Sequence, residues 1–151
     1  MRVLIVYGSQ YGNTQKLAQA MGRALAPEHD VRVLHAPAAR AVTAEGVDLL
    51  IVGAPTQMRG LRLLAKPFLA GLEGRGFEGV PAAAFDTRMG EFVQTIASDV
   101  IARHLVGAGC RLIGSPASFL VLGLDGPLAA GEEKRAAAWA ISVAESVPVR
   151  A

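Results

Sequence analysis

Short apolar runs recur along the chain, and stretches with helical spacing separate them. A continuous apolar run of four to six residues is typical of a strand that is buried on both faces of a parallel sheet. The runs lie at residues 3–6, 31–34, 47–52, 80–85 and, in two pieces, at 110–113 and 118–121. The pattern therefore predicts five strands, the fifth of them interrupted near Pro116.

Helices are predicted between most of these strands. Leu17, Met21 and Leu25 recur at helical spacing after the first run. Further helices are expected from Pro67 onward, over 94–108 and over 132–146, while residues 36–46 predict an irregular crossover or a short helix. Strands that alternate with helices, without an internal repeat or a linker, indicate an α/β doubly wound sandwich that forms a single domain over residues 1–151.

Three polar loops follow the first, third and fourth strands. They span residues 8–14, 54–60 and 86–92. Right-handed crossovers place the loops that follow parallel strands at one edge of the sheet, where ligands of doubly wound folds bind. We therefore expect the three loops to converge on one site.

The first loop has the features of a phosphate site. It lies between a strand and a helix, so its backbone N–H groups and the positive end of the helix dipole face one point. A nucleoside-triphosphatase loop requires a Lys before the Ser or Thr, and no Lys precedes Thr14. The three glycines of a dinucleotide fingerprint are not present either. A phosphate monoester is the anion that fits, and a plain strand-to-helix turn is the alternative. The candidate residues are Ser9, Gln10, Tyr11, Gly12, Asn13 and Thr14.

The spacing Ser9-x-x-Gly12-x-Thr14 after an apolar strand resembles the phosphate loop of the flavodoxin family, whose pattern is Ser/Thr-x-Thr-Gly-x-Thr. Tyr11 stands where that pattern has its second Thr. The segment 53–56, Gly-Ala-Pro-Thr, is similar to the Gly-x-Pro-Thr of flavodoxins, and segments 84–88 and 123–135 resemble parts of some actinobacterial flavodoxin-like proteins. The resemblance implies a five-stranded parallel sheet in the order 2-1-3-4-5 and flavin mononucleotide (FMN) as the cofactor.

The resemblance also implies that the second and third loops hold the flavin ring. The residues expected there are Pro55, Thr56, Gln57, Met58, Arg59 and Gly60 in one loop and Asp86, Thr87 and Arg88 in the other. Typical flavodoxins place an aromatic residue in each of these loops to stack on the flavin. Here the nearest aromatic of the third loop is Phe92, and the positions are otherwise not matched.

Composition narrows the class of protein and the kind of partner. No run reaches the ~18 apolar residues of a membrane span, so we expect no association with a membrane. The chain enters its first strand at once, so we expect no signal peptide and a cytoplasmic location. Cys110 is the single cysteine, which excludes an internal disulfide. The net charge is +2, without a basic run interleaved with aromatics, which argues against nucleic acid. With Arg59 and Arg88 in the ring loops, the charge favours a redox partner with an acidic surface.

Three functions remain open at this point. The first is an FMN electron carrier, which needs no catalytic acid or base and is favoured over a substrate-specific enzyme. The second is a small FMN-dependent reductase of quinones, which would use the same site. The third is an interaction or regulatory module with weak or no flavin binding, suggested by Tyr11 and by the unmatched aromatic positions.

Overall fold

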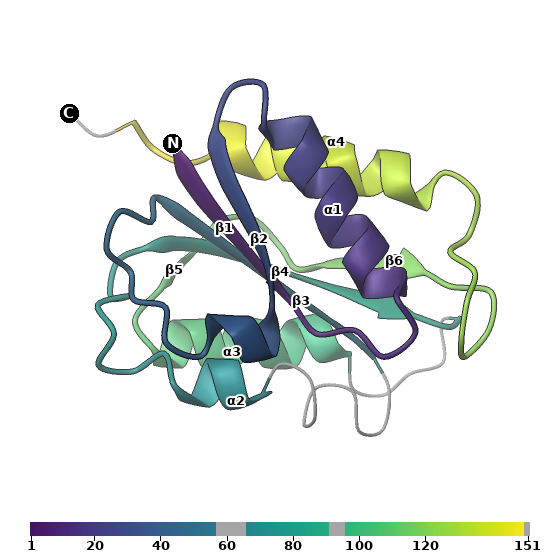
Figure 1. Ribbon diagram of the computed structural model, residues 1–151, viewed down its shortest axis with the longest axis horizontal. Helices are drawn as coiled ribbons and strands as arrows, with labels where there is room; N and C mark the ends of the chain where they lie inside the picture. Colours follow the sequence, from purple (N-terminus) through teal and green to yellow (C-terminus); the bar gives the residue numbers. More distant parts are fainter. Residues whose placement is uncertain (57–65, 91–95, 150–151) are drawn as a thin grey trace.

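A parallel sheet forms the centre of the protein (Figure 1). The computed structural model describes residues 1–56, 66–90 and 96–149. The strands are β1 (Arg2–Tyr7), β2 (Asp30–His35), β3 (Leu49–Pro55), β4 (Pro81–Arg88), β5 (Arg111–Leu112) and β6 (Ala117–Leu120). Their order is β2-β1-β3-β4-β5, with β6 also paired to β4, and all pairings between these strands are parallel. The predicted order is confirmed.

The predicted fifth strand consists of two short strands on the same neighbour. β5 pairs with the beginning of β4, where Pro81 lies opposite Arg111, and β6 pairs with its end, where Phe85 lies opposite Ala117. Residues 113–116 separate the two pieces, as the Gly114-Ser115-Pro116 sequence indicates. The last position of the sheet is therefore shared by two strands of two and four residues.

Helices cover both faces of the sheet (Figure 1). α1 (Asn13–Leu25) and α4 (Glu132–Glu145) lie on one face, and α2 (Lys66–Ala70) and α3 (Ala97–Gly107) lie on the other together with the short 3₁₀ helix η1 (Ala36–Ala39). Within the described segments, no helix is both long enough and apolar enough to cross a membrane.

The strand residues alternate between two cores. In β1, Leu4 and Val6 belong to the core beneath α2 and α3, while Val3 and Ile5 belong to the core beneath α1 and α4. This period of two, with every one of these side chains apolar, is why the sequence shows continuous apolar runs. Trp139 packs against Phe85 and Phe119 in the second core, with ring centroids 6.0 and 6.1 Å away.

β4 extends three residues further than its sequence pattern predicts. Asp86, Thr87 and Arg88 were expected in a polar loop after the strand, and that expectation of a loop is wrong: they are the last three residues of β4. Here β4 is paired on both sides, because β3 continues to Pro55 opposite Thr87 and β6 runs to Leu120 opposite Arg88. Backbone pairing with two neighbours holds Asp86 in a strand that its own β propensity does not favour, and Thr87 follows in the same ladder.

Candidate functional site

The ends of β1, β3 and β4 meet through three threonines. Thr14, in the first turn of α1, lies 3.0 Å from Thr87 of β4, hydroxyl to hydroxyl, and the two residues are 1 % and 4 % exposed. Thr56, which follows β3, donates its backbone N–H to the Thr87 carbonyl at 2.7 Å. The expected convergence of the three loops at one edge of the sheet is thus seen for the part that the structure describes.

Most backbone amides of the loop between β1 and α1 are unpaired within the described segments. Ser9 Oγ accepts the N–H of Gly12 at 3.0 Å, which leaves the Ser9 hydroxyl proton free to donate. The amides of residues 9–11 and 13–15 have no acceptor among the described residues. Gly12 has φ +88°, and a Cβ there would meet no atom within 4 Å, so its left-handed backbone is the reason for glycine. Free amides and two hydroxyls at a helix N-terminus form an arrangement that binds an anion.

The N-terminus of α3 is capped by side chains from two other elements. Thr56 Oγ1 accepts the N–H of Ala97 at 2.9 Å, and Asp86 Oδ2 accepts the N–H of Ser98 at 2.9 Å. Asp86 is fully buried, and its Oδ1 has no partner among the described residues. Because Ile96, at the N-cap position, makes no side-chain cap, these distant residues take over the role that a local Ser or Asp usually has.

The segment that follows β6 closes one side of the loop between β1 and α1. Gly126 lies so close to Asn13 that a Cβ on the glycine would stand 2.7 Å from Asn13 Oδ1. Val121 pairs with Leu128 in an antiparallel bridge, which turns the chain back toward β6. Asn13 is 8 % exposed. Residues 121–131 were not among the predicted site residues, although a loop after the last parallel strand lies at this same edge by the rule that placed the others.

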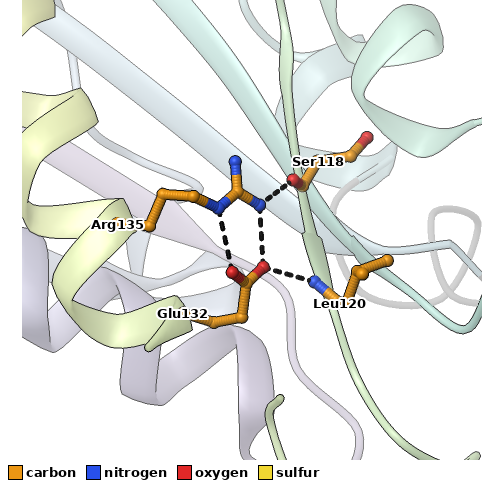
Figure 2. Close-up of polar contacts among 4 residues, drawn as sticks. All are labelled: Ser118, Leu120, Glu132 and Arg135. Carbon is orange, nitrogen blue, oxygen red and sulfur yellow. Dashed lines mark hydrogen bonds and ion pairs between the residues drawn. The ribbon is translucent and has the colours of Figure 1, made fainter. Parts of the chain in front are cut away.

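A charged pair on α4 fixes that segment (Figure 2). Glu132 Oε2 accepts the N–H of Leu120 at 2.7 Å, and both carboxylate oxygens accept from Arg135, at 2.7 and 2.9 Å. Arg135 also donates to the Ser118 carbonyl, and its guanidinium lies 4.5 Å from the centre of the Phe119 ring. The hydrogen bond from Arg135, and secondarily the Leu120 amide, lowers the pKa of the Glu132 carboxyl below its ordinary 4.5. The carboxylate therefore ties β6 to α4 on either side of the loop.

The predicted site residues fall into four groups. Ser9 and Gly12 are half-buried in the loop, Gln10 and Tyr11 are exposed, and Asn13 and Thr14 are buried at the start of α1. Pro55 is the buried last residue of β3, and Thr56 follows it. Asp86 and Thr87 are buried and Arg88 is half-buried at the end of β4. Gln57, Met58, Arg59 and Gly60 lie outside the described residues, as does Phe92.

The single cysteine lies outside this site. Cys110 is buried immediately before β5. Burial, and secondarily the charge of Glu78, raises the pKa of its thiol to about 11. A buried thiol with a raised pKa packs as a core residue and is little ionised near neutral pH. In the segments that the structure covers, no cluster of three His, Cys, Asp or Glu side chains is arranged to hold a metal ion.

Comparison with protein families gives the relationship. The family model described as Flavodoxin matches residues 5–139, which is most of the chain. The chain belongs to the flavodoxin family. Among curated proteins, no match is found for this flavodoxin-family chain. The narrower similarity to actinobacterial flavodoxin-like proteins stays a prediction.

Solved flavodoxin structures share the fold of this family member over nearly the whole chain. Oxidised flavodoxin 2 from Bacillus cereus has 24 % sequence identity and a TM-score of 0.77, with 96 % of this chain and 99 % of that chain covered. A flavodoxin from Streptococcus pneumoniae has 20 % identity and a TM-score of 0.73, covering 97 % and 100 %. Two-electron reduced Megasphaera elsdenii flavodoxin has 21 % identity and a TM-score of 0.66, covering 93 % and 98 %. At these identities the likeness concerns the fold.

Proposed function

We propose that the protein is an FMN-binding electron carrier that holds the FMN phosphate in the loop from Ser9 to Thr14. One observation carries the proposal: the amides of residues 9–11 and 13–15 have no acceptor in the described part of the chain and surround the N-terminus of a 13-residue helix. An unsatisfied group of N–H donors at a helix N-terminus is complementary to a phosphate monoester. Membership in the flavodoxin family supports FMN as the molecule that bears it.

The phosphate site uses neutral donors. The Ser9 hydroxyl keeps its proton free, because its oxygen accepts from Gly12, and the Thr14 hydroxyl lies at the same helix turn. Gly12 supplies the left-handed backbone, with φ +88°, that shapes this loop. When bound, FMN supplies the one- and two-electron chemistry of its ring, and the protein supplies binding, orientation and the electrostatic surroundings.

The ring end of the proposed site is built from the ends of β3 and β4. We assign Pro55 and Thr56 to one wall and Arg88 to the other, and residues 57–60, expected beside Pro55 and Thr56, lie outside the described residues. Asp86 and Thr87 are buried, so we assign them to holding this wall rather than to direct contact with the ring. Thr56 is anchored twice, through its amide to Thr87 and through its hydroxyl to Ala97. An anchored wall lowers the entropy cost of holding a flat ring.

The proposed partner is a redox protein with an acidic surface that meets the flavin edge. The net charge of +2 supports it, together with Arg88 at the end of β4. Opposite charges raise the rate of encounter between proteins, and salt screens them. We also propose that the protein works in the cytoplasm.

Visible absorption spectra of the purified protein with and without FMN test the proposal. We expect bound flavin, and we expect Thr14→Ala to weaken FMN more than riboflavin, because only FMN carries the phosphate. Thr43→Ala, at an exposed position in the η1–β3 connection, is the control and should change neither affinity. Equal losses for both flavins would place the phosphate elsewhere. No FMN binding at micromolar protein would favour the interaction module, and oxidation of NAD(P)H by the holoprotein with a quinone would favour the reductase.

A further inference from the structure

We propose that Thr87 is a positioning residue for the phosphate loop: its hydroxyl donates to Thr14 Oγ1 and leaves the Thr14 proton for an oxygen of the bound phosphate. The proposal rests on the proposed function, since it assigns a role within the same site. Its starting point is the 3.0 Å contact between two hydroxyls that are 73 residues apart and almost fully buried.

Thr87 is the rigid member of the pair. Its backbone lies in β4, paired to Pro55 of β3 and to Phe119 of β6, and its carbonyl accepts the Thr56 amide at 2.7 Å. Thr14 lies in the first turn of α1. Among the described residues, the amides of residues 13–15 find no acceptor there, and that of Lys16 donates to the Gly12 carbonyl at 3.0 Å. The strand therefore holds the helix end, and the Thr87 hydroxyl is the link that connects them.

The number of hydroxyl protons shows that this pair lacks one acceptor. Each threonine hydroxyl carries one proton and two lone pairs. One proton is used in the contact, and neither Oγ1 has another partner among the described residues. Both residues are almost fully buried, and a hydroxyl proton without an acceptor at such a position is unfavourable.

A bound phosphate selects one of the two orientations of the pair. If Thr14 donates to Thr87, the spare proton lies on Thr87, among the paired strands. If Thr87 donates to Thr14, the spare proton lies on Thr14, within the group of free amides at residues 9–11 and 13–15. An anion held by those amides accepts a hydrogen bond from the Thr14 hydroxyl, so anion binding favours the orientation in which Thr87 donates to Thr14. A hydrogen bond to a charged oxygen is stronger than one to a neutral hydroxyl, which directs the effect to FMN over riboflavin.

Titration of five variants with FMN and with riboflavin tests this role. Thr87→Val removes the hydroxyl at nearly constant shape and should raise the Kd of FMN about 2- to 12-fold, the loss of one net hydrogen bond, while that of riboflavin should stay unchanged. Thr87→Ser retains the donor and should remain within twofold of wild type. In a Thr14→Val background, Thr87→Val should have no further effect, because its partner is gone. Thr43→Val serves as the surface control.

Several outcomes would overturn the proposal. These are an unchanged FMN affinity in Thr87→Val, equal losses for FMN and riboflavin, or additive losses in the double variant. If Thr87→Val does not fold, NMR of the wild type decides: the Thr87 hydroxyl proton should be protected from exchange at all times, and the Thr14 proton only after phosphate is added.

Inorganic phosphate separates this proposal from the proposed function. Phosphate-induced shifts of residues 9–15 that depend on Thr87, without FMN binding, would refute the electron carrier and retain this role; no shifts and no FMN binding would refute both.

Discussion

The carboxylate of Glu132 makes a prediction that the structure allows to be worked out in some detail. Glu132→Gln keeps an oxygen for the Leu120 amide but places an NH₂ group opposite Arg135, so one charge-assisted hydrogen bond becomes a contact between donors. Hydrogen bonds to charged groups contribute about 1.5–3 kcal/mol. The Arg135 side chain is 51 % exposed, and solvent screening reduces this figure. We therefore expect a loss of about 1–2 kcal/mol in the free energy of unfolding, or about 2–8 °C in Tm.

The effect should depend on pH in a defined direction. Because the pKa of Glu132 is lowered in the folded protein, the carboxylate contributes stability above its ordinary pKa of 4.5, and this contribution is lost as pH falls through the lowered folded value. The difference between wild type and Glu132→Gln should thus be constant between about pH 5 and 7 and should shrink below about pH 4.5. A protonated Glu132 and a glutamine present similar groups to Arg135, which is why the curves should converge.

Urea unfolding at a series of pH values, followed by the fluorescence of Trp139, measures this difference. Glu133→Gln is the matched control: it removes the same charge from the same first turn of α4 at an exposed position, so it reports the helix-dipole term alone. Subtracting the control leaves the contribution of the contacts in Figure 2. Two results would refute the reasoning. One is a loss in Glu132→Gln no larger than in the control, and the other is a difference that persists undiminished at pH 3.

Three further predictions concern other parts of the protein. Gly53→Ala should lower the free energy of unfolding in urea by about 1–3 kcal/mol, because its Cβ would lie 2.1 Å from the buried Phe85 ring. Gly107→Ala, with open space around its Cβ, is the control and should not destabilise the protein, and equal effects would contradict this reasoning. Cys110, with a pKa of about 11, is roughly one-thousandth thiolate at pH 8, so it should react with a disulfide reagent only on unfolding, and fast labelling of the native protein would show that it is accessible. Reoxidation of reduced holoprotein by ferricyanide, an anion, should slow with added salt and in Arg88→Gln; rates that rise with salt would mean a negative surface at the flavin edge.

The apolar pattern predicted β1, β3 and most of β4 because these strands are buried on both faces. Val3–Val6 and their partners in β3 alternate between two cores, so every position is apolar and the run is easily recognised. The end of β4 was not recognised as strand because its residues are polar. Asp86 and Thr87 are held in the strand by pairing with β3 and β6, and the backbone groups that pair them leave no trace in the local sequence.

The candidate site could be predicted as far as its elements are local. The loop from Ser9 to Thr14 was recognised because strand, polar loop and helix follow one another in sequence. The contacts that organise it are long-range: Thr14 with Thr87, Thr56 with Ala97, and Asn13 beside Gly126. No spacing rule connects residues 41 to 113 positions apart, so these contacts came only from the fold.

These long-range contacts bear on how strongly the site binds. A loop that must order itself around a ligand loses conformational entropy at that moment, and the affinity falls accordingly. Here the start of α1 is joined to β4 through two buried threonines, and the start of α3 is joined to β3 and β4 through Thr56 and Asp86. The described part of the site is therefore fixed before any ligand arrives, and the ordering has already been offset by the folding free energy. This preorganisation acts in favour of binding and opposes the loss expected from the unmatched aromatic positions.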